Sequence, residues 1–128
     1  MIKRDNVRVC VPRYMQIGKG SLNQLPEILN IIGSVKSLLI VTDKQMVKFG
    51  YVKKLQDILS KAGFKSNIFD DTIPDPTDTV VLSGVDILKK NKNDAVIGFG
   101  GGSPIDTAKA IAVLSQYSKN IQDYKPPS

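Results

Sequence analysis

A strand, a cluster of glycines and a helix follow one another near the end of this chain, and this order limits the fold more than any other feature. Four of the ten glycines lie within positions 98–102, directly after the apolar run Ala95-Val96-Ile97. From Ile105 onward, apolar residues recur at helical spacing. The glycines therefore occupy the turn between a predicted buried strand and a predicted helix.

This turn has the properties of an anion site. Ser103 is predicted to be the N-cap of the helix, with Pro104 at the first helical position and Asp106 at the capping-box position. The unpaired N–H groups and the positive end of the helix dipole favour an anion there, and phosphate is the one we expect. The alternative is a tight, capped turn without a ligand, which needs one or two glycines rather than four.

Two well-known phosphate-binding motifs do not fit the stretch. In the dinucleotide fingerprint G-x-G-x-x-G, Ser103 would stand where the third glycine belongs, and the fingerprint follows a first strand rather than a late one. The P-loop pattern G-x-x-x-x-G-K-S/T is absent. If the turn binds phosphate, it therefore does so by a motif other than these two.

The rest of the chain alternates between strand and helix patterns. Further strands are expected at 37–42 and 64–69, and helices at 25–32, 44–62 with a break at Gly50, 80–88 and from 104. Residues 7–11 and 14–17 predict a short β-ribbon at the N-terminus. The pattern predicts one α/β domain over 1–128, a Rossmann-like parallel sheet flanked by helices.

Ligands of such sheets bind beyond the carboxyl ends of the strands. This rule brings three unusual stretches to one edge, namely Asp43, the proline-rich loop 74–77 and the turn 100–103. A nucleotide site is the function that this convergence favours. For Asp43 an alternative stays open, since Asp is also a favoured N-cap for the helix that is predicted to start near Lys44.

Composition excludes several other functions. The net charge of +6 raises nucleic acid as a partner, but the basic residues are scattered and no zinc-finger spacing or arginine-rich arm is present. No apolar run approaches membrane-spanning length, and the first residues, Met-Ile-Lys-Arg-Asp-Asn, lack the long apolar region of a signal peptide. We therefore expect a cytoplasmic protein with no membrane or nucleic-acid partner. One cysteine, Cys10, excludes an internal disulfide.

The chain has no histidine. It therefore lacks the usual general base at neutral pH and the commonest metal ligand, and a single cysteine cannot form a soft metal site. Transition-metal chemistry cannot rest on this chain alone, so no catalytic residue and no metal ligand is assigned to it.

The segment Gly100-Gly101-Gly102-Ser103-Pro104-Ile105-Asp106-Thr107-Ala108-Lys109 closely resembles the Gly-Gly-Gly-Ser-x-x-Asp-x-x-Lys segment of the iron-containing alcohol dehydrogenases. Residues 14–109 also resemble the amino-terminal, nucleotide-binding half of that family through Gly18-x-Gly20, Val41-Thr42-Asp43 and Pro74-x-Pro76-Thr77. The resemblance implies an NAD site in which the glycine turn holds the pyrophosphate and Asp43 faces the adenosine ribose. The implied cofactor-binding residues are Asp43, Asp75, Pro76, Thr77, Gly100, Gly101, Gly102, Ser103 and Asp106. The family commonly has Asn where this chain has Asp75.

In that family a Thr-Thr-containing phosphate loop comes next, and a helical domain follows with one Asp and three His ligands for iron or zinc. The resemblance therefore implies that the chain is the cofactor-binding portion of a longer enzyme, which transfers hydride reversibly between NAD and an alcohol. The 128-residue chain alone is expected to be inactive. Two alternative functions remain open, namely a glycerol dehydrogenase-like relative and a non-catalytic nucleotide-binding module. A homodimer is also possible.

Overall fold

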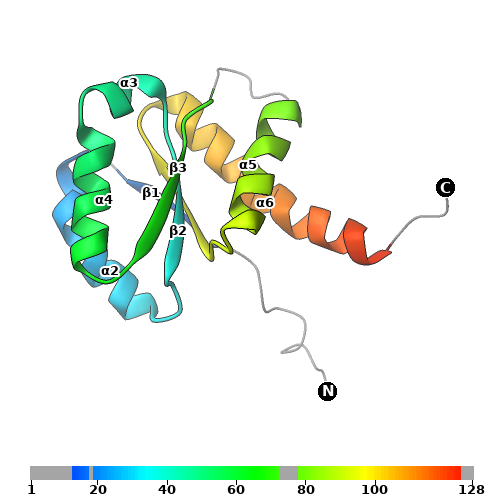
Figure 1. The fold of residues 1–128 in the computed structure, drawn as a ribbon, viewed down its shortest axis with the longest axis horizontal. Coiled ribbons are helices and arrows are strands. Elements are labelled where there is room, and N and C mark those ends of the chain that lie inside the picture. The colour runs from blue at the N-terminus through cyan, green and yellow to red at the C-terminus, as the bar shows by residue number, and fades with distance from the viewer. Residues whose placement is uncertain (1–12, 18, 73–77, 125–128) are drawn as a thin grey trace.

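The protein folds into a parallel sheet between two layers of helices (Figure 1). The computed structural model describes residues 13–17, 19–72 and 78–124. The sheet has four strands in the order β1-β4-β2-β3, and all neighbours pair in parallel. The strands are β1 (Arg13–Ile17), β2 (Ser37–Val41), β3 (Lys65–Phe69) and β4 (Ala95–Phe99). The predicted α/β class with a parallel sheet is confirmed.

The helices lie where the apolar periodicity predicts them. A 3-10 helix, η1 (Lys19–Gln24), leads into α2, and α5 and α6 flank β4 along the chain. The α-helices are α2 (Leu25–Ile32), α3 (Lys44–Lys48), α4 (Tyr51–Lys61), α5 (Asp78–Lys90) and α6 (Gly102–Tyr124). The predicted break within 44–62 separates α3 from α4 at Gly50, whose φ of 86° is readily adopted only by glycine.

The strand predicted at 14–17 has a partner in the main sheet that the sequence did not indicate. The structure pairs β1 in parallel with β4, with Ile17 opposite Phe99, so β1 lies at the edge of the sheet that the described strands form. Residues 7–11, the other half of the predicted ribbon, lie outside the described residues.

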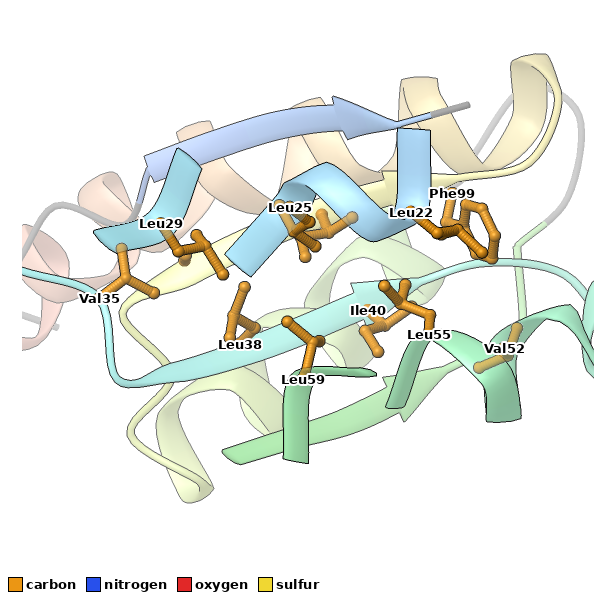
Figure 2. Close-up of a cluster of buried hydrophobic side chains, with 12 residues drawn as sticks. Leu22, Leu25, Leu29, Val35, Leu38, Ile40, Val52, Leu55, Leu59 and Phe99 are labelled. Atoms are coloured by element: carbon orange, nitrogen blue, oxygen red, sulfur yellow. The ribbon is translucent and has the colours of Figure 1, made fainter. Parts of the chain in front are cut away.

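The central strands are buried on both faces because helices cover both sides of the sheet. Leu38 and Ile40 of β2 pack with α2 and α4, as Figure 2 shows, whereas Leu39 and Val41 of the same strand pack with α5 and α6. Since side chains alternate along a strand, one continuous apolar run supplies both cores. The two helix layers therefore hold the carboxyl ends of β2 and β4 in fixed positions.

The apolar core between the sheet and helices α5 and α6 depends on a close approach of these two helices at Gly84. A Cβ on Gly84 would lie 2.8 Å from Cγ1 of Ile111, a fully buried side chain, and 3.5 Å from the ring of Phe69. Any larger residue must displace packed atoms. The glycine thus sets the distance between the two helices on this face.

We expect Gly84→Ala to lower the free energy of unfolding by about 1–3 kcal/mol, the usual cost of overpacking a core. Urea unfolding monitored by circular dichroism measures the change. Ser83→Ala, on the exposed side of the same helix, is the control and should stay within about 0.5 kcal/mol of wild type. Equal stability of the two variants would contradict the close contact.

Candidate dinucleotide site

The direction in which strands are added to the sheet reverses between β2 and β4. The chain runs from β2 to β3 on one side, and β4 then pairs with β2 on the other side. After β2 the chain continues into α3 and α4 on one face, and after β4 it continues into α6 on the opposite face (Figure 1). Ligands of open α/β sheets bind at such a switch point.

Gly100 begins the turn that follows β4, and it has to be glycine. Its φ is 139°, a conformation that residues with a Cβ rarely adopt. A Cβ there would also lie 3.0 Å from Cγ of Pro104 and 3.3 Å from Oδ2 of Asp43. The turn therefore passes close to the end of β2.

The next two glycines have no such structural reason. Neither Gly101 nor Gly102 has a positive φ, and a Cβ on either would meet no atom within 4 Å. Both residues are exposed. The fold would thus accept a side chain at either position, and the open space beside the backbone can hold a ligand.

Helix α6 begins earlier than the sequence predicts. Its first residue is Gly102, and the carbonyl of Gly101 accepts a hydrogen bond of 3.3 Å from the N–H of Ile105. The prediction of Ser103 as N-cap with Pro104 at the first position is therefore wrong. Pro104 stands at the third helical position. Its missing N–H still costs nothing there, because the N–H groups of the first turn have no intrahelical acceptor.

This start leaves a set of free donors. Within the part of the chain that the structure describes, the N–H groups of Gly101, Gly102 and Ser103 donate to no backbone carbonyl. The first turn of α6 contains no acidic residue, and Asp106 lies exposed just beyond it rather than in a capping box. A negative group placed here would meet unpaired N–H groups and the positive end of a long helix.

Asp43 lies beside this turn and also caps α3. Its Oδ1 accepts a hydrogen bond of 2.8 Å from the N–H of Met46, so the predicted N-cap role is confirmed. Its Oδ2 is the oxygen that faces Gly100. Asp43 and the glycine turn are thus brought together. The third expected stretch, Asp75, Pro76 and Thr77, lies outside the described residues.

Sequence reasoning assigned no role to the hydroxyls of two threonines, Thr42 directly after β2 and Thr72 three residues after β3. Thr42 is fully buried, and its hydroxyl donates a hydrogen bond of 2.7 Å to the carbonyl of Phe99. Thr72 donates from its hydroxyl to the carbonyl of Thr42 at 2.8 Å. The one available signal was a polar residue at the end of the apolar run 38–41.

An exposed ion-pair cluster joins the ends of β2 and β3. The amine of Lys44 lies 2.8 Å from Asp71 and 3.1 Å from Asp70. The pKa of Lys44 is raised above its ordinary value, mainly by the hydrogen bond to Asp71 and then by the one to Asp70. Because the lysine is largely exposed, the pairs contribute little to stability, but they hold its charge at the end of β3.

The described residues contain no group of three or more potential metal ligands close together. No described helix is both long enough and apolar enough to cross a membrane.

The sequence of this chain is similar to those of several known dehydrogenases. The sequence model of the iron-containing alcohol dehydrogenases matches residues 12–128. An NADPH-dependent butanol dehydrogenase of Clostridium saccharobutylicum is 35% identical over 122 residues, which are 94% of this chain and 30% of that protein. An NAD-dependent methanol dehydrogenase of Bacillus methanolicus is 37% identical over 90% of this chain and 30% of its own length. Lactaldehyde reductase of Escherichia coli K12 is 41% identical over 77% of this chain and 25% of its own length.

Solved structures give the same result. An archaeal halo-thermophilic alcohol dehydrogenase from a Red Sea brine pool superimposes with a TM-score of 0.68 and 30% identity, covering 81% of this chain and 25% of that one. A 1,3-propanediol oxidoreductase gives a TM-score of 0.65 and 34% identity, over 77% of this chain and 26% of its own. This chain thus spans 25% to 30% of the length of these relatives. It belongs to the iron-containing alcohol dehydrogenase family.

Proposed function

We propose that residues 1–128 form the NAD(H)-binding domain of an iron-containing alcohol dehydrogenase, which oxidises a small alcohol reversibly to an aldehyde or ketone. The observation that carries this proposal is the pair Gly101 and Gly102, which are glycines without a structural need and which open onto free space at the start of α6. No contact within the chain requires these two residues to be small, but a residue without a side chain lets a ligand approach the backbone closely.

The donors and charges at this edge fit a dinucleotide. The N–H groups of Gly101, Gly102 and Ser103 bind the pyrophosphate, whose charge the α6 dipole stabilises. The carboxylate of Asp43 accepts hydrogen bonds from the ribose hydroxyls and disfavours a 2′-phosphate, which makes NAD the preferred cofactor. Gly100 shapes the turn. The family resemblance adds Asp106, Asp75, Pro76 and Thr77 to the proposed cofactor-binding residues.

When bound, NAD supplies a nicotinamide ring that accepts hydride from the alcohol. The contribution of this chain is to bind and orient that cofactor. The relatives named above act, by their names, on butanol, methanol, lactaldehyde and 1,3-propanediol, which supports a small alcohol or aldehyde as substrate. The single cysteine and the absence of long apolar runs in the sequence support a cytoplasmic location.

The residues of this chain do not fit the iron or zinc site of the family. The sequence has no histidine, and the described carboxylates form no cluster of three. Metal ligands therefore have to come from residues other than these, and no catalytic step is assigned to the chain.

The proposal predicts binding without turnover. Calorimetric titration of the 128-residue chain with NADH should show one site per chain, because the pyrophosphate donors and Asp43 are all present. The same chain with NAD, an alcohol and ferrous or zinc ions should produce no NADH, because the metal ligands are missing. Absence of NADH binding would contradict the dinucleotide site, and metal-dependent NADH formation would contradict the assignment of the chemistry to other residues.

A further inference from the structure

Thr42 uses all of its polar groups to join strand ends. Its N–H donates to the carbonyl of Phe69 at 2.9 Å, and its own carbonyl accepts from the hydroxyl of Thr72 at 2.8 Å. Its hydroxyl donates to the carbonyl of Phe99 at 2.7 Å. One fully buried residue therefore connects the ends of β2, β3 and β4.

The hydrogen bond from the Thr42 hydroxyl to the Phe99 carbonyl continues the contact between β2 and β4 beyond their last paired residues. The last residues paired between β2 and β4 are Val41 and Gly98, so the carbonyl of Phe99 lies beyond this ladder. Without the hydroxyl of Thr42, a buried carbonyl would lose the partner that it has on the β2 side. The peptide that follows is the entry to the glycine turn.

This position gives the hydroxyl a specific effect. Because a peptide group is planar, the direction of the Phe99 carbonyl also fixes the N–H of Gly100. Gly100 starts the turn at a φ of 139°, and glycine has many other conformations available to it. A fixed peptide in front of three successive glycines restricts the conformations that the turn can adopt.

We propose that Thr42 is a positioning residue, whose hydroxyl holds the glycine turn in the geometry that binds the dinucleotide. The inference rests on the proposed dinucleotide site. Preorganisation of a flexible loop increases affinity by reducing the ordering that binding requires. Loss of the hydroxyl is therefore expected to weaken NADH binding although Thr42 does not touch the cofactor.

Two substitutions at this position separate the hydroxyl from the packing of the side chain. Thr42→Val keeps the shape and removes the hydrogen bond, whereas Thr42→Ser keeps the hydroxyl and removes a buried methyl group. Ser115→Ala is the matched control, since Ser115 is buried in α6 and donates to the carbonyl of Ala112 at 2.9 Å, away from the turn. All three variants lose buried interactions, so all three are expected to be less stable than wild type.

The test measures the dissociation constant for NADH and the urea midpoint of each folded variant. We expect a rise of about tenfold in the dissociation constant for Thr42→Val and less than about twofold for Thr42→Ser and Ser115→Ala. If Thr42 only stabilises the fold, Thr42→Val and Thr42→Ser should bind NADH with the same affinity. Equal NADH affinity of those two variants would overturn the inference.

A second readout does not depend on the cofactor. The amide signals of Gly100, Gly101 and Gly102 in heteronuclear NMR spectra report the geometry of the turn directly. Thr42→Val should shift or broaden all three, while Thr42→Ser and Ser115→Ala should leave them in place. If wild type fails to bind NADH, the proposed function fails, and these signals still decide on Thr42. Unchanged glycine signals in Thr42→Val would refute its positioning role.

Discussion

Gly101→Asp is expected to abolish NADH binding while the domain stays folded. Position 101 has no positive φ and its Cβ would meet open space, so the fold accepts the side chain. The residue precedes the first helical residue and its carbonyl accepts the first hydrogen bond of α6, which makes it the N-cap. Because Asp is a favoured N-cap, the free energy of unfolding should stay within about 0.5 kcal/mol of wild type.

The loss of binding follows from charge as well as size. A carboxylate at this site would lie beside the pyrophosphate, and two like charges 4 Å apart near a protein surface repel by about 4 kcal/mol. We expect affinity for NADH, measured by calorimetry, to fall at least about 100-fold. Gly101→Asn is the matched control, since Asn has the same shape and is an equally good cap but carries no charge.

The Asp and Asn variants together determine the role of the turn. Asn should bind NADH more weakly than wild type because its side chain occupies the open space, and clearly more tightly than Asp. If the folded Asp variant binds NADH as wild type does, the glycine turn is not part of the site.

Asp43→Ser is expected to narrow the preference for NADH over NADPH by about tenfold. The carboxylate repels a 2′-phosphate, and serine removes this charge while its hydroxyl can still cap α3 through the N–H of Met46. The free energy of unfolding should change by no more than about 1 kcal/mol. Because the chain has no tryptophan, the fluorescence of NADH and of NADPH, titrated with the protein, gives the two affinities.

Asp57→Asn is the control for the change in net charge. Asp57 is exposed on α4 and borders a polar pocket with Ser37 and Lys65, at the opposite ends of β2 and β3. This variant should leave the cofactor preference unchanged. A preference that is also unchanged in a stable Asp43→Ser variant would leave Asp43 with its capping role alone.

The structure shows that the two roles considered for Asp43 are compatible. One carboxylate oxygen caps α3, and the other faces Gly100 at the turn after β4. From the sequence, the capping role and the ribose contact were treated as alternatives, because the residue type alone does not show that the two carboxylate oxygens point to different neighbours. A carboxylate fixed by its own helix is also a preorganised acceptor for a ribose.

The strands β2 and β4 could be predicted because each is a short run of mainly apolar residues between turn residues. The strand β3 has only two apolar residues, Ile68 and Phe69, and was indicated by its place between the turn at Gly63 and the pair Asp70-Asp71. The parallel arrangement of these strands followed from the helices between them. The partner of β1 could not be predicted, since a local pattern does not state which distant strand it will pair with. The contact between Gly84 and Ile111 was missed for the same reason.

The start of α6 shows a different limit of prediction. Ser103-Pro104 is a strong local signal for an N-cap followed by a first helical residue. The backbone is already helical at Gly102, two residues before the predicted start at Pro104, with the carbonyl of Gly101 accepting the first hydrogen bond of the helix. The hydroxyl of Thr42 was overlooked because its acceptor, the carbonyl of Phe99, lies 57 positions away.

The central place of β4 also determines when this sheet can be completed. β4 is the last of the four strands to be synthesised, yet both β1 and β2 pair with it. Until residues 95–99 leave the ribosome, β2 has only β3 as a neighbour, and β1 has no neighbour among the described strands. Because contacts between such distant segments form slowly, we expect insertion of β4 to be the late step of folding. The edge of β2 that receives β4 is then the surface most exposed to aggregation during synthesis.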